Sequence, residues 1–387
     1  MCPIQTMTTA TGKLSAPIGA TYGVSDRKHS RRWRELVSMA ARVQQFLLQR
    51  RYESELAPFA ALRASCYDRL WAAAAANVGA TIEDLGYGLT RIARDGRETF
   101  VSGSRVMLDG PVTLKMAGNK PLVSRLLQEH GHPVGRFLEF KIDEMERAEA
   151  FLANLGGLAV VKPGMSGASG HGVTLGVGTK RDLRRAAAVA STFSKTILIE
   201  QQAAGPSYRL LYIDGEFIDA IERRPPCLVG DGRQTLAQLI KKENLRRIQG
   251  VAPLAVQPIV VDVELRRCLD EQGLSLSSVL AVNSNVVIKA PVNENTAAEN
   301  SNVRDRVHPD TIRRGAKIAR LLRIRLAGHD VITTDISRPL AETGGVFNEV
   351  NTTPGLQHHY LIDRPEQAFP VLERLLDVLL GPGEWPQ

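Results

Sequence analysis

The chain has 387 residues, of which 43% are hydrophobic and 23% charged, so it can bury a large core or two to three packed subdomains. No stretch approaches the roughly 20 apolar residues that a membrane-spanning helix needs, and the start lacks the charged-then-apolar pattern of a signal peptide. We therefore expect a soluble, cytoplasmic protein with no membrane partner. The net charge of +8 leaves nucleic acid and small polyanions open as partners.

Neither the basic run near the start nor the cysteines match a binding motif. Residues 27–34 carry five lysine and arginine side chains but do not match the aromatic and glycine pattern of an RNA-binding motif, so we interpret this run as a solvated helix start and expect no nucleic-acid partner. The four cysteines, Cys2, Cys66, Cys227 and Cys268, are far apart, which is typical of reduced thiols and not of a zinc site or a disulfide framework.

The N-terminal part of the chain divides into a tail and a mixed region. Residues 1–25 contain no acidic residue and few large apolar ones, so we predict a disordered tail over residues 1–30. Apolar residues at helical spacing predict helices over residues 31–47 and 67–77, and alternating residues predict strands at 81–85, 88–92 and 98–101. Residues 31–115 are therefore predicted to form a helical and mixed α/β region.

From residue 110 on, strands and helices alternate. A helix is predicted through residues 119–129, and further helices at 180–193, 235–248 and 309–322. Strands are predicted at residues 134–140, 158–161, 196–200, 208–213, 216–222, 330–336 and 346–351. Antiparallel hairpins between helices are typical of an α+β fold.

A glycine-rich loop follows an apolar strand that ends in Lys162. Glycine tolerates unusual dihedral angles, so the backbone N–H groups of such a loop can turn toward a phosphate. The loop is neither a P-loop nor a dinucleotide-binding fingerprint, and by itself it leaves a plain hairpin open. Lys162 favours an anion site, because a lysine in an apolar strand needs an anionic partner to offset its desolvation. The candidate loop residues are Gly164, Ser166, Gly167, Gly170 and Gly172.

A candidate metal site comes from the last two predicted strands. Glu349 and Asn351 are two residues apart, so they share one face of a strand, and Asp335 on a neighbouring strand could meet them. Two carboxylates and an amide oxygen suit Mg²⁺, which takes its other ligands from water and phosphate. The pattern of Glu349 and Asn351 alone would also fit an exposed polar face, but the apolar residues around it indicate burial.

Two arginines lie at the edges of apolar strands, Arg209 and Arg223. Either could be an ordinary surface residue. Their positions favour an inward role in binding an anion, since the guanidinium group suits phosphate and carboxylate.

The order of these features resembles the ATP-grasp portion of cyanophycin synthetase and the related ligase module of bifunctional glutathione synthetase. The resemblance runs from about residue 85 to residue 358, about seven tenths of the chain. Several independent stretches carry it: Leu85-Gly86-Tyr87-Gly88, Asn119-Lys120, Val160-Val161-Lys162-Pro163, Ile199-Glu200, Tyr208-Arg209-Leu210-Leu211, Glu222-Arg223, Val229-Gly230-Asp231-Gly232, Asp305-Arg306-Val307-His308-Pro309, Thr334-Asp335-Ile336, Glu349-Val350-Asn351 and Pro354-Gly355-Leu356.

The resemblance implies an ATP-grasp fold that binds ATP and Mg²⁺ between two subdomains, over residues 116–203 and 204–387. It implies that Lys120 and Lys162 hold the ATP phosphates under the glycine-rich loop. It implies an adenine hinge made by Glu200, Gln201 and the backbone near Ala203. The implied Mg²⁺ ligands are Asp335, Glu349 and Asn351. Arg223 is implied to contact the transferred phosphoryl group, and Arg209 a phosphate or a substrate carboxylate.

The implied activity is ATP-dependent ligation of a carboxylate to an amine through an acyl phosphate, on amino-acid or small-peptide substrates. A non-catalytic ATP-binding module and a glutathione-like ligase remain alternatives, and a homo-oligomer is left open. The glycine-rich loop is one residue longer than in cyanophycin synthetase, and residues 293–298 lack two glycines of that family. The sequence to Gln387 has no Mur-ligase-like half, so we expect no unaided synthesis of the cyanophycin repeating unit.

Overall fold

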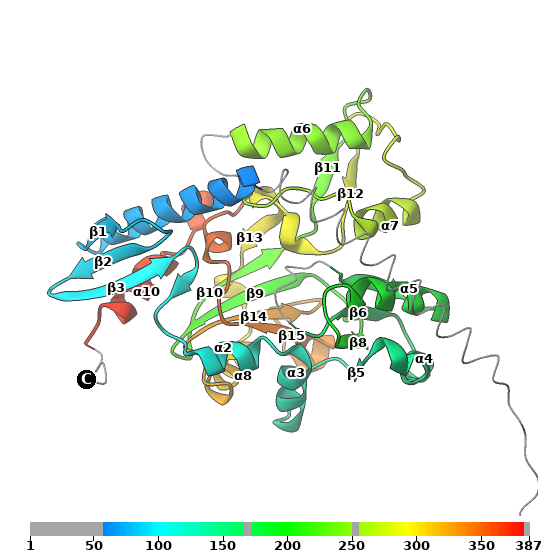
Figure 1. The fold of residues 1–387 in the computed structure, drawn as a ribbon, viewed down its shortest axis with the longest axis horizontal. Coiled ribbons are helices and arrows are strands. Elements are labelled where there is room, and N and C mark those ends of the chain that lie inside the picture. The colour runs from blue at the N-terminus through cyan, green and yellow to red at the C-terminus, as the bar shows by residue number, and fades with distance from the viewer. Residues whose placement is uncertain (1–56, 166–171, 250–254, 383–387) are drawn as a thin grey trace, which may run out of the picture.

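Two antiparallel sheets form the centre of the molecule in this computed structural model, which describes residues 57–165, 172–249 and 255–382 (Figure 1). A third sheet and a long helix form a layer at the N-terminal side, and a small subdomain is inserted between two strands of the central sheet. The tail and first helix predicted before residue 57 lie outside the described residues.

The N-terminal layer is a helix that covers residues 57–77, packed on a four-stranded sheet (Figure 1). Trp71 of this helix is buried against Ile92 and Val101 of the sheet. The strands are β1 (Thr81–Asp84), β2 (Thr90–Arg94), β3 (Arg97–Ser102) and β4 (Arg105–Val106), and the C-terminal helix α10 (Val371–Leu379) joins the same core. The predicted helix at 67–77 and the three predicted strands are confirmed.

The segment after Gly110 differs from the single helix predicted there. It forms two helices, α2 (Pro111–Ala117) and α3 (Lys120–Glu129). Asn119 separates them because its backbone is extended and its side chain accepts a hydrogen bond from the Leu122 N–H, which caps α3. Lys120 is therefore the first residue of a helix.

The first central sheet has the strand order β5-β8-β6-β7. Its strands are β5 (Phe137–Phe140), β6 (Ala159–Pro163), β7 (Thr174–Val177) and β8 (Ile197–Gln201). Helices α4 (Met145–Ala153) and α5 (Lys180–Ser191) pack against it, and the buried alanines of α5 allow close approach to the sheet. Lys162 and Glu200 lie on neighbouring strands of this sheet.

The second central sheet has the order β13-β10-β9-β14-β15. Its strands are β9 (Ser207–Ile213), β10 (Glu216–Arg223), β13 (Asn300–Asn302), β14 (Leu326–Ile332) and β15 (Val346–Asn351), and α8 (Pro309–Leu321) packs against it. The prediction of a strand at 330–336 is wrong by four residues. The strand ends at Ile332 because its partner β9 begins at Ser207, directly after Gly205 and Pro206, so later residues have no strand to pair with.

The inserted subdomain lies between β10 and β13 and has its own core, which includes Leu236, Leu265 and Ile288. It consists of β11 (Cys227–Val229), α6 (Leu236–Gln249), α7 (Val263–Glu271) and β12 (Asn285–Val287). A short helix α9 (Leu340–Thr343) precedes β15. Among the helices of the described residues, none is long and apolar enough to span a bilayer.

We expect Gly315→Ala to destabilise the fold by pressing α8 away from β9. A Cβ atom at Gly315 would lie 2.2 Å from the hydroxyl oxygen of the fully buried Tyr212. Overpacking of this kind costs about 1–3 kcal/mol, more than the roughly 1 kcal/mol that alanine gains over glycine in a helix. Urea unfolding measures the change, and Lys317→Ala on the exposed side of α8 is the control. An unchanged or raised free energy of unfolding for the alanine variant would contradict this packing.

Candidate functional site

The second central sheet brings four charged or polar side chains together on one face. Asp330 of β14 lies opposite Arg209 of β9 on one side and opposite Glu349 of β15 on the other. Directly opposed residues of antiparallel strands point to the same face, and Asn351 follows Glu349 by two residues onto that face. The Asn351 amide donates to Asp330 Oδ2 at 3.5 Å. Asp330, Glu349 and Asn351 therefore form one oxygen-rich group.

Asp335 is not part of this group, so the predicted strand position for it is wrong. It lies three residues beyond the last β14–β15 pair, Ile332 with Val346, whereas Glu349 lies three residues along β15 in the other direction. At roughly 3.3 Å per residue, this separates the two carboxylates along the sheet. The Asp335 carboxylate instead accepts hydrogen bonds from the backbone N–H and hydroxyl of Ser337.

The sequence contained evidence for Asp330, but the predicted strand began at residue 330, four residues too late. Asp330 is a carboxylate inside the apolar run Leu326–Ile332, and Gly328 stands two residues before it on the same face. A Cβ atom at Gly328 would lie 2.7 Å from Pro354 and 3.1 Å from the Arg209 side chain, so glycine leaves room for Arg209 beside Asp330. A strand predicted from Leu326 would have found Asp330.

Each carboxylate of this group is balanced by a cation. Arg209 donates through Nε and Nη2 to both oxygens of Asp330, the Nη2 contact being 2.9 Å, and both residues are buried. Lys120 Nζ lies 2.6 Å from Glu349 Oε1. Burial opposes ionisation of Asp330, but the charges of Arg209, Arg223 and Lys120 hold its pKa below the usual value.

The two carboxylates and one amide are too few to hold a metal ion by themselves. Within the described ranges no three His, Cys, Asp or Glu side chains cluster as a metal site. A hard divalent cation bound here would therefore take most of its ligands from water or from an anionic ligand, as Mg²⁺ does. The donor set is of the right kind for Mg²⁺ held together with phosphate.

Lys162 has the anionic partner that its position in an apolar strand requires. Its Nζ lies 2.6 Å from Glu200 Oε1, and both side chains are buried. The pair joins β6 to β8 diagonally, since Lys162 lies opposite Leu198 and Glu200 lies opposite Val160. Gln201 is exposed and its N–H donates to the Arg136 carbonyl at 2.7 Å, and Ala203 is half-buried in the connection to β9.

The two ends of the glycine-rich loop are held close to the first central sheet. Gly164 donates to the Thr196 carbonyl at 2.8 Å and accepts from the Lys120 N–H at 3.1 Å, which ties the loop to α3. Gly172 has a φ of +76°, and a Cβ atom there would lie 2.6 Å from the Phe193 ring. Ser166, Gly167 and Gly170 lie outside the described residues.

Arg223 is buried beside the same carboxylates but has no carboxylate of its own among the described residues. It is 3% exposed, and its Nη2 donates to the Val292 carbonyl at 3.2 Å and to Asn293 Oδ1 at 3.4 Å. Its Nε has no hydrogen-bond partner. Burial and the nearby charge of Arg209 lower its pKa to about 10, against the opposing charges of Asp330 and Glu349.

The segment that follows β15 is fixed by a fully buried pair. His359 Nδ1 lies 2.7 Å from Asp219 Oδ2, and the other oxygen of Asp219 accepts from Asn302 at 3.0 Å. Tyr67 donates to Gln357 from the N-terminal helix. Sequence reasoning missed Tyr67, Gln357 and His359, because their partners are far away in the chain.

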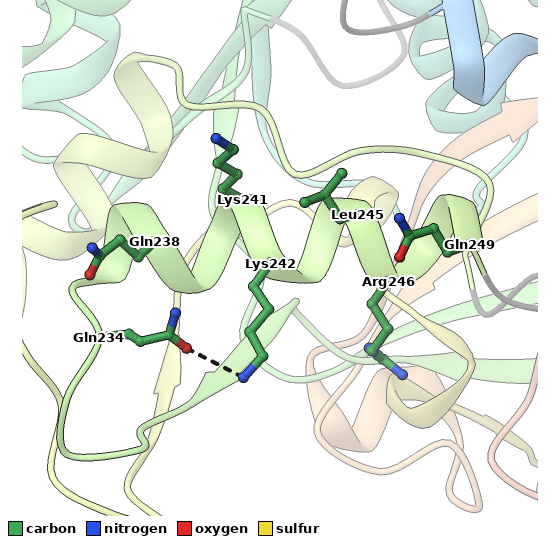
Figure 2. Close-up of a pocket in the computed structure, with 7 residues that line it drawn as sticks. All are labelled: Gln234, Gln238, Lys241, Lys242, Leu245, Arg246 and Gln249. Atoms are coloured by element: carbon green, nitrogen blue, oxygen red, sulfur yellow. Dashed lines mark hydrogen bonds between the residues drawn. The ribbon is translucent and has the colours of Figure 1, made fainter.

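A hollow of about 580 Å³ lies elsewhere, on the outer side of the inserted subdomain (Figure 2). It is lined by α6 and the residue shortly before it: Gln234, Gln238, Lys241, Lys242, Leu245, Arg246 and Gln249. Figure 2 shows these side chains spreading to different sides of one helix, with Lys242 donating to Gln234 at 3.3 Å. None of the predicted site residues lines this hollow. The candidate site is therefore the face of the second central sheet that carries Asp330 and Glu349.

The fold of the chain is the α+β fold of the ATP-grasp class. No protein-family model matches the chain. The chain is homologous to cyanophycin synthetase of Synechocystis sp., with 32% identity over 306 residues, covering 77% of this chain and 33% of that protein. Cyanophycin synthetase of Crocosphaera subtropica is 29% identical over 304 residues, covering 77% of this chain and 33% of that protein.

The second group of relatives is the glutathione biosynthesis bifunctional proteins. That of Mannheimia succiniciproducens is 26% identical over 272 residues, covering 68% of this chain and 36% of the relative. Among solved structures, the bifunctional glutathione synthetase of Pasteurella multocida superposes with a TM-score of 0.50 at 22% identity, over 78% of this chain and 42% of that one. The chain thus spans about a third of the length of the curated relatives it matches.

We expect Asp330→Asn to lower the free energy of unfolding by roughly 3–5 kcal/mol at pH 7, because it leaves the Arg209 charge buried without a partner. The native pKa of Asp330 lies below its unfolded value of about 3.9, so its contribution is complete above that pH and is lost as pH falls through the native pKa. The difference between wild type and variant should therefore shrink in acid. Urea unfolding from pH 7 to pH 3.5 measures it.

Asp335→Asn is the matched control for that experiment, because within the described residues the Asp335 carboxylate accepts hydrogen bonds only from Ser337. Its cost should stay below about 1 kcal/mol. Equal costs for the two variants would show that the Arg209 pair is not the buried charge pair described.

Proposed function

We propose that the chain is an ATP-dependent carboxylate–amine ligase that forms an amide or peptide bond and releases ADP and phosphate. The observation that carries the proposal is the grouping of Lys120, Arg209 and Arg223 around two carboxylates, Asp330 and Glu349, on one face of the central sheet. Three cations around a pair of metal-binding carboxylates suit the terminal phosphates of a nucleotide with its divalent cation.

The nucleotide is proposed to bind between the two central sheets, with its phosphates toward the second. Lys162 and Lys120 hold the phosphates, together with the loop that Gly164 and Gly172 anchor. Glu200, Gln201 and the backbone near Ala203, at the connection between the sheets, hold the adenine. Mg²⁺ on Asp330, Glu349 and Asn351 would supply neutralisation of phosphate charge and orientation of the phosphates.

The reaction is proposed to have two steps. A carboxylate oxygen of the donor attacks the γ-phosphorus, the bond from that phosphorus to the bridging oxygen of ADP breaks, and an acyl phosphate and ADP result. An amine nitrogen then attacks the acyl carbon, phosphate leaves, and the nitrogen loses a proton. Arg223 provides a fixed, buried cation beside the phosphoryl group, which is anionic in both steps.

The substrates are proposed to be amino acids or small peptides, as the relatives' names suggest for their own substrates. A ligase with a glutathione-like product has the same site and differs only in its substrates. A non-catalytic ATP-binding module is the alternative of another class. The cations and carboxylates grouped at this site favour a ligase.

The proposal predicts the products. In a panel of amino acids and dipeptides with ATP and Mg²⁺, a productive pair should release one ADP and one phosphate for each bond formed, and hydroxylamine should trap the donor as a hydroxamate. Release of AMP and pyrophosphate would replace this mechanism by an adenylating one. ATP binding by calorimetry without ADP release for any pair would favour the non-catalytic module.

Two variants separate the metal ligands from a nearby carboxylate. Glu349→Gln removes a charge from the proposed Mg²⁺ site, so ADP release should fall by at least about a hundredfold, because a bound metal ion supplies several kcal/mol to such a step. Asp335→Asn should stay within about threefold of wild type, since Asp335 lies beyond the paired strands. Initial rates against Mg²⁺ concentration measure both, with folding checked by circular dichroism. A large decrease in the rate of ADP release by the Asp335 variant would indicate that Asp335 is a ligand of the metal ion after all.

A further inference from the structure

One charged residue lies on the inward face of the N-terminal helix. Phe59, Tyr67 and Trp71 of this helix are 2%, 4% and 1% exposed, and they recur at helical spacing. Arg63 stands between Phe59 and Tyr67 in the same stripe, four residues from each, where an apolar residue would be expected. Its neighbour Arg69 on the same helix is exposed.

The stripe faces the segment that follows β15. Tyr67 donates to Gln357, and Tyr67 also lies close enough to Arg209 to contribute to its raised pKa. The next residue, His358, is surrounded by cations. Burial, and then the charges of Arg223, Arg209, His359 and Arg63, keep its pKa well below the usual value. His358 is therefore neutral near pH 7 and can donate one hydrogen bond.

The positive charge in this region exceeds the negative charge that faces it. Asp330 is bonded to Arg209, and Glu349 to Lys120. Within the described part of the chain, neither Arg63 nor Arg223 has a carboxylate partner. The Nε atoms of both are buried without a hydrogen bond, and the hydrogen bond of Arg63 to the Val256 carbonyl is long, at 3.5 Å. Arg223 is buried and Arg63 is half-buried with a buried Nε, and two such guanidinium groups without a carboxylate partner among the described residues favour an anionic ligand.

We propose that Arg63, together with His358, binds a carboxylate of the amino-acid or peptide substrate that is not the one activated. This inference rests on the proposed ligase function and assigns a substrate-selecting role to the N-terminal helix. In the proposed mechanism the activated carboxylate meets the phosphoryl group on the sheet, beside Arg223, Arg209 and Lys120. Arg63 reaches the site from a separate layer, so it binds a different group. A free carboxylate suits the planar guanidinium fork.

The test compares free acids with their amides. Thermal unfolding is followed with Mg²⁺ and a non-hydrolysable ATP analogue, in titrations with L-amino acids, dipeptides and the matching carboxamides. Acids that stabilise the wild type should bind at least about tenfold more tightly than their amides, since a hydrogen-bonded charge pair is lost in the amide. In Arg63→Gln this ratio should fall to within about twofold, and Arg63→Lys should restore part of it.

Arg69→Gln is the matched control and should keep the wild-type ratio. Stabilisation by the nucleotide analogue alone should be the same in Arg63→Gln and wild type. A loss of nucleotide binding in that variant would assign Arg63 to a phosphate and overturn the proposal. The same holds if no acid in the panel binds more tightly than its amide, or if Arg63→Gln keeps the discrimination.

A second measurement locates the carboxylate on the donor or on the acceptor. Hydroxylamine replaces the amine acceptor, so hydroxamate formation reports the donor alone. An increase in the donor KM of Arg63→Gln in this assay places the carboxylate on the donor, and an increase seen only for the amine in full ligation places it on the acceptor. An unchanged KM for both overturns the proposal. Absence of ADP release in the wild type is a failure of the proposed function, whereas acid-selective binding remains measurable without turnover.

Discussion

The buried pair of Arg209 and Asp330 is the interaction on which the site depends. The two residues lie directly opposite each other on β9 and β14, and both oxygens of the carboxylate accept from the guanidinium group. Neither charge could remain at this depth alone, since an unpaired buried ion costs several kcal/mol. Because the pair also lies opposite Glu349, the strand register that satisfies Arg209 is the register that assembles the oxygen-rich group.

Most other charged side chains of the site are likewise paired with a group of opposite charge, and two are not. Lys120 is balanced by Glu349, and Lys162 by Glu200. The pairs lie on different sheets, and α3 connects them, since Lys120 contacts Glu349 through its side chain and Gly164 through its backbone. Among the described residues, Arg223 and Arg63 are the arginines of this region that have no carboxylate partner. Their positive charge favours an anionic ligand at the proposed site.

Three layers meet at the site, and buried polar contacts hold them in place. The N-terminal helix reaches the segment after β15 through Tyr67 and Gln357, and that segment is bound to β10 through His359 and Asp219. The His359 and Asp219 side chains are fully buried. Such a network defines one geometry, because any shift leaves a buried polar group without its partner. The N-terminal layer is thereby fixed against the segment that follows β15.

The amino-acid sequence alone determined those features that depend on local periodicity and composition. Glu349 and Asn351 could be assigned to one strand face because the side-chain period of a strand is two, and Lys162 could be assigned an anionic partner because it ends an apolar strand. Asp330 could not be separated from Asp335, because both stand in one run of strand-forming residues and only pairing with β9 sets where β14 ends. Arg63 is separated from His358 by almost the whole described chain, so no local pattern joins them. Only the packing of the N-terminal helix against the segment after β15 brings them near each other. Such a tertiary contact between distant segments cannot be predicted from the local pattern of either one.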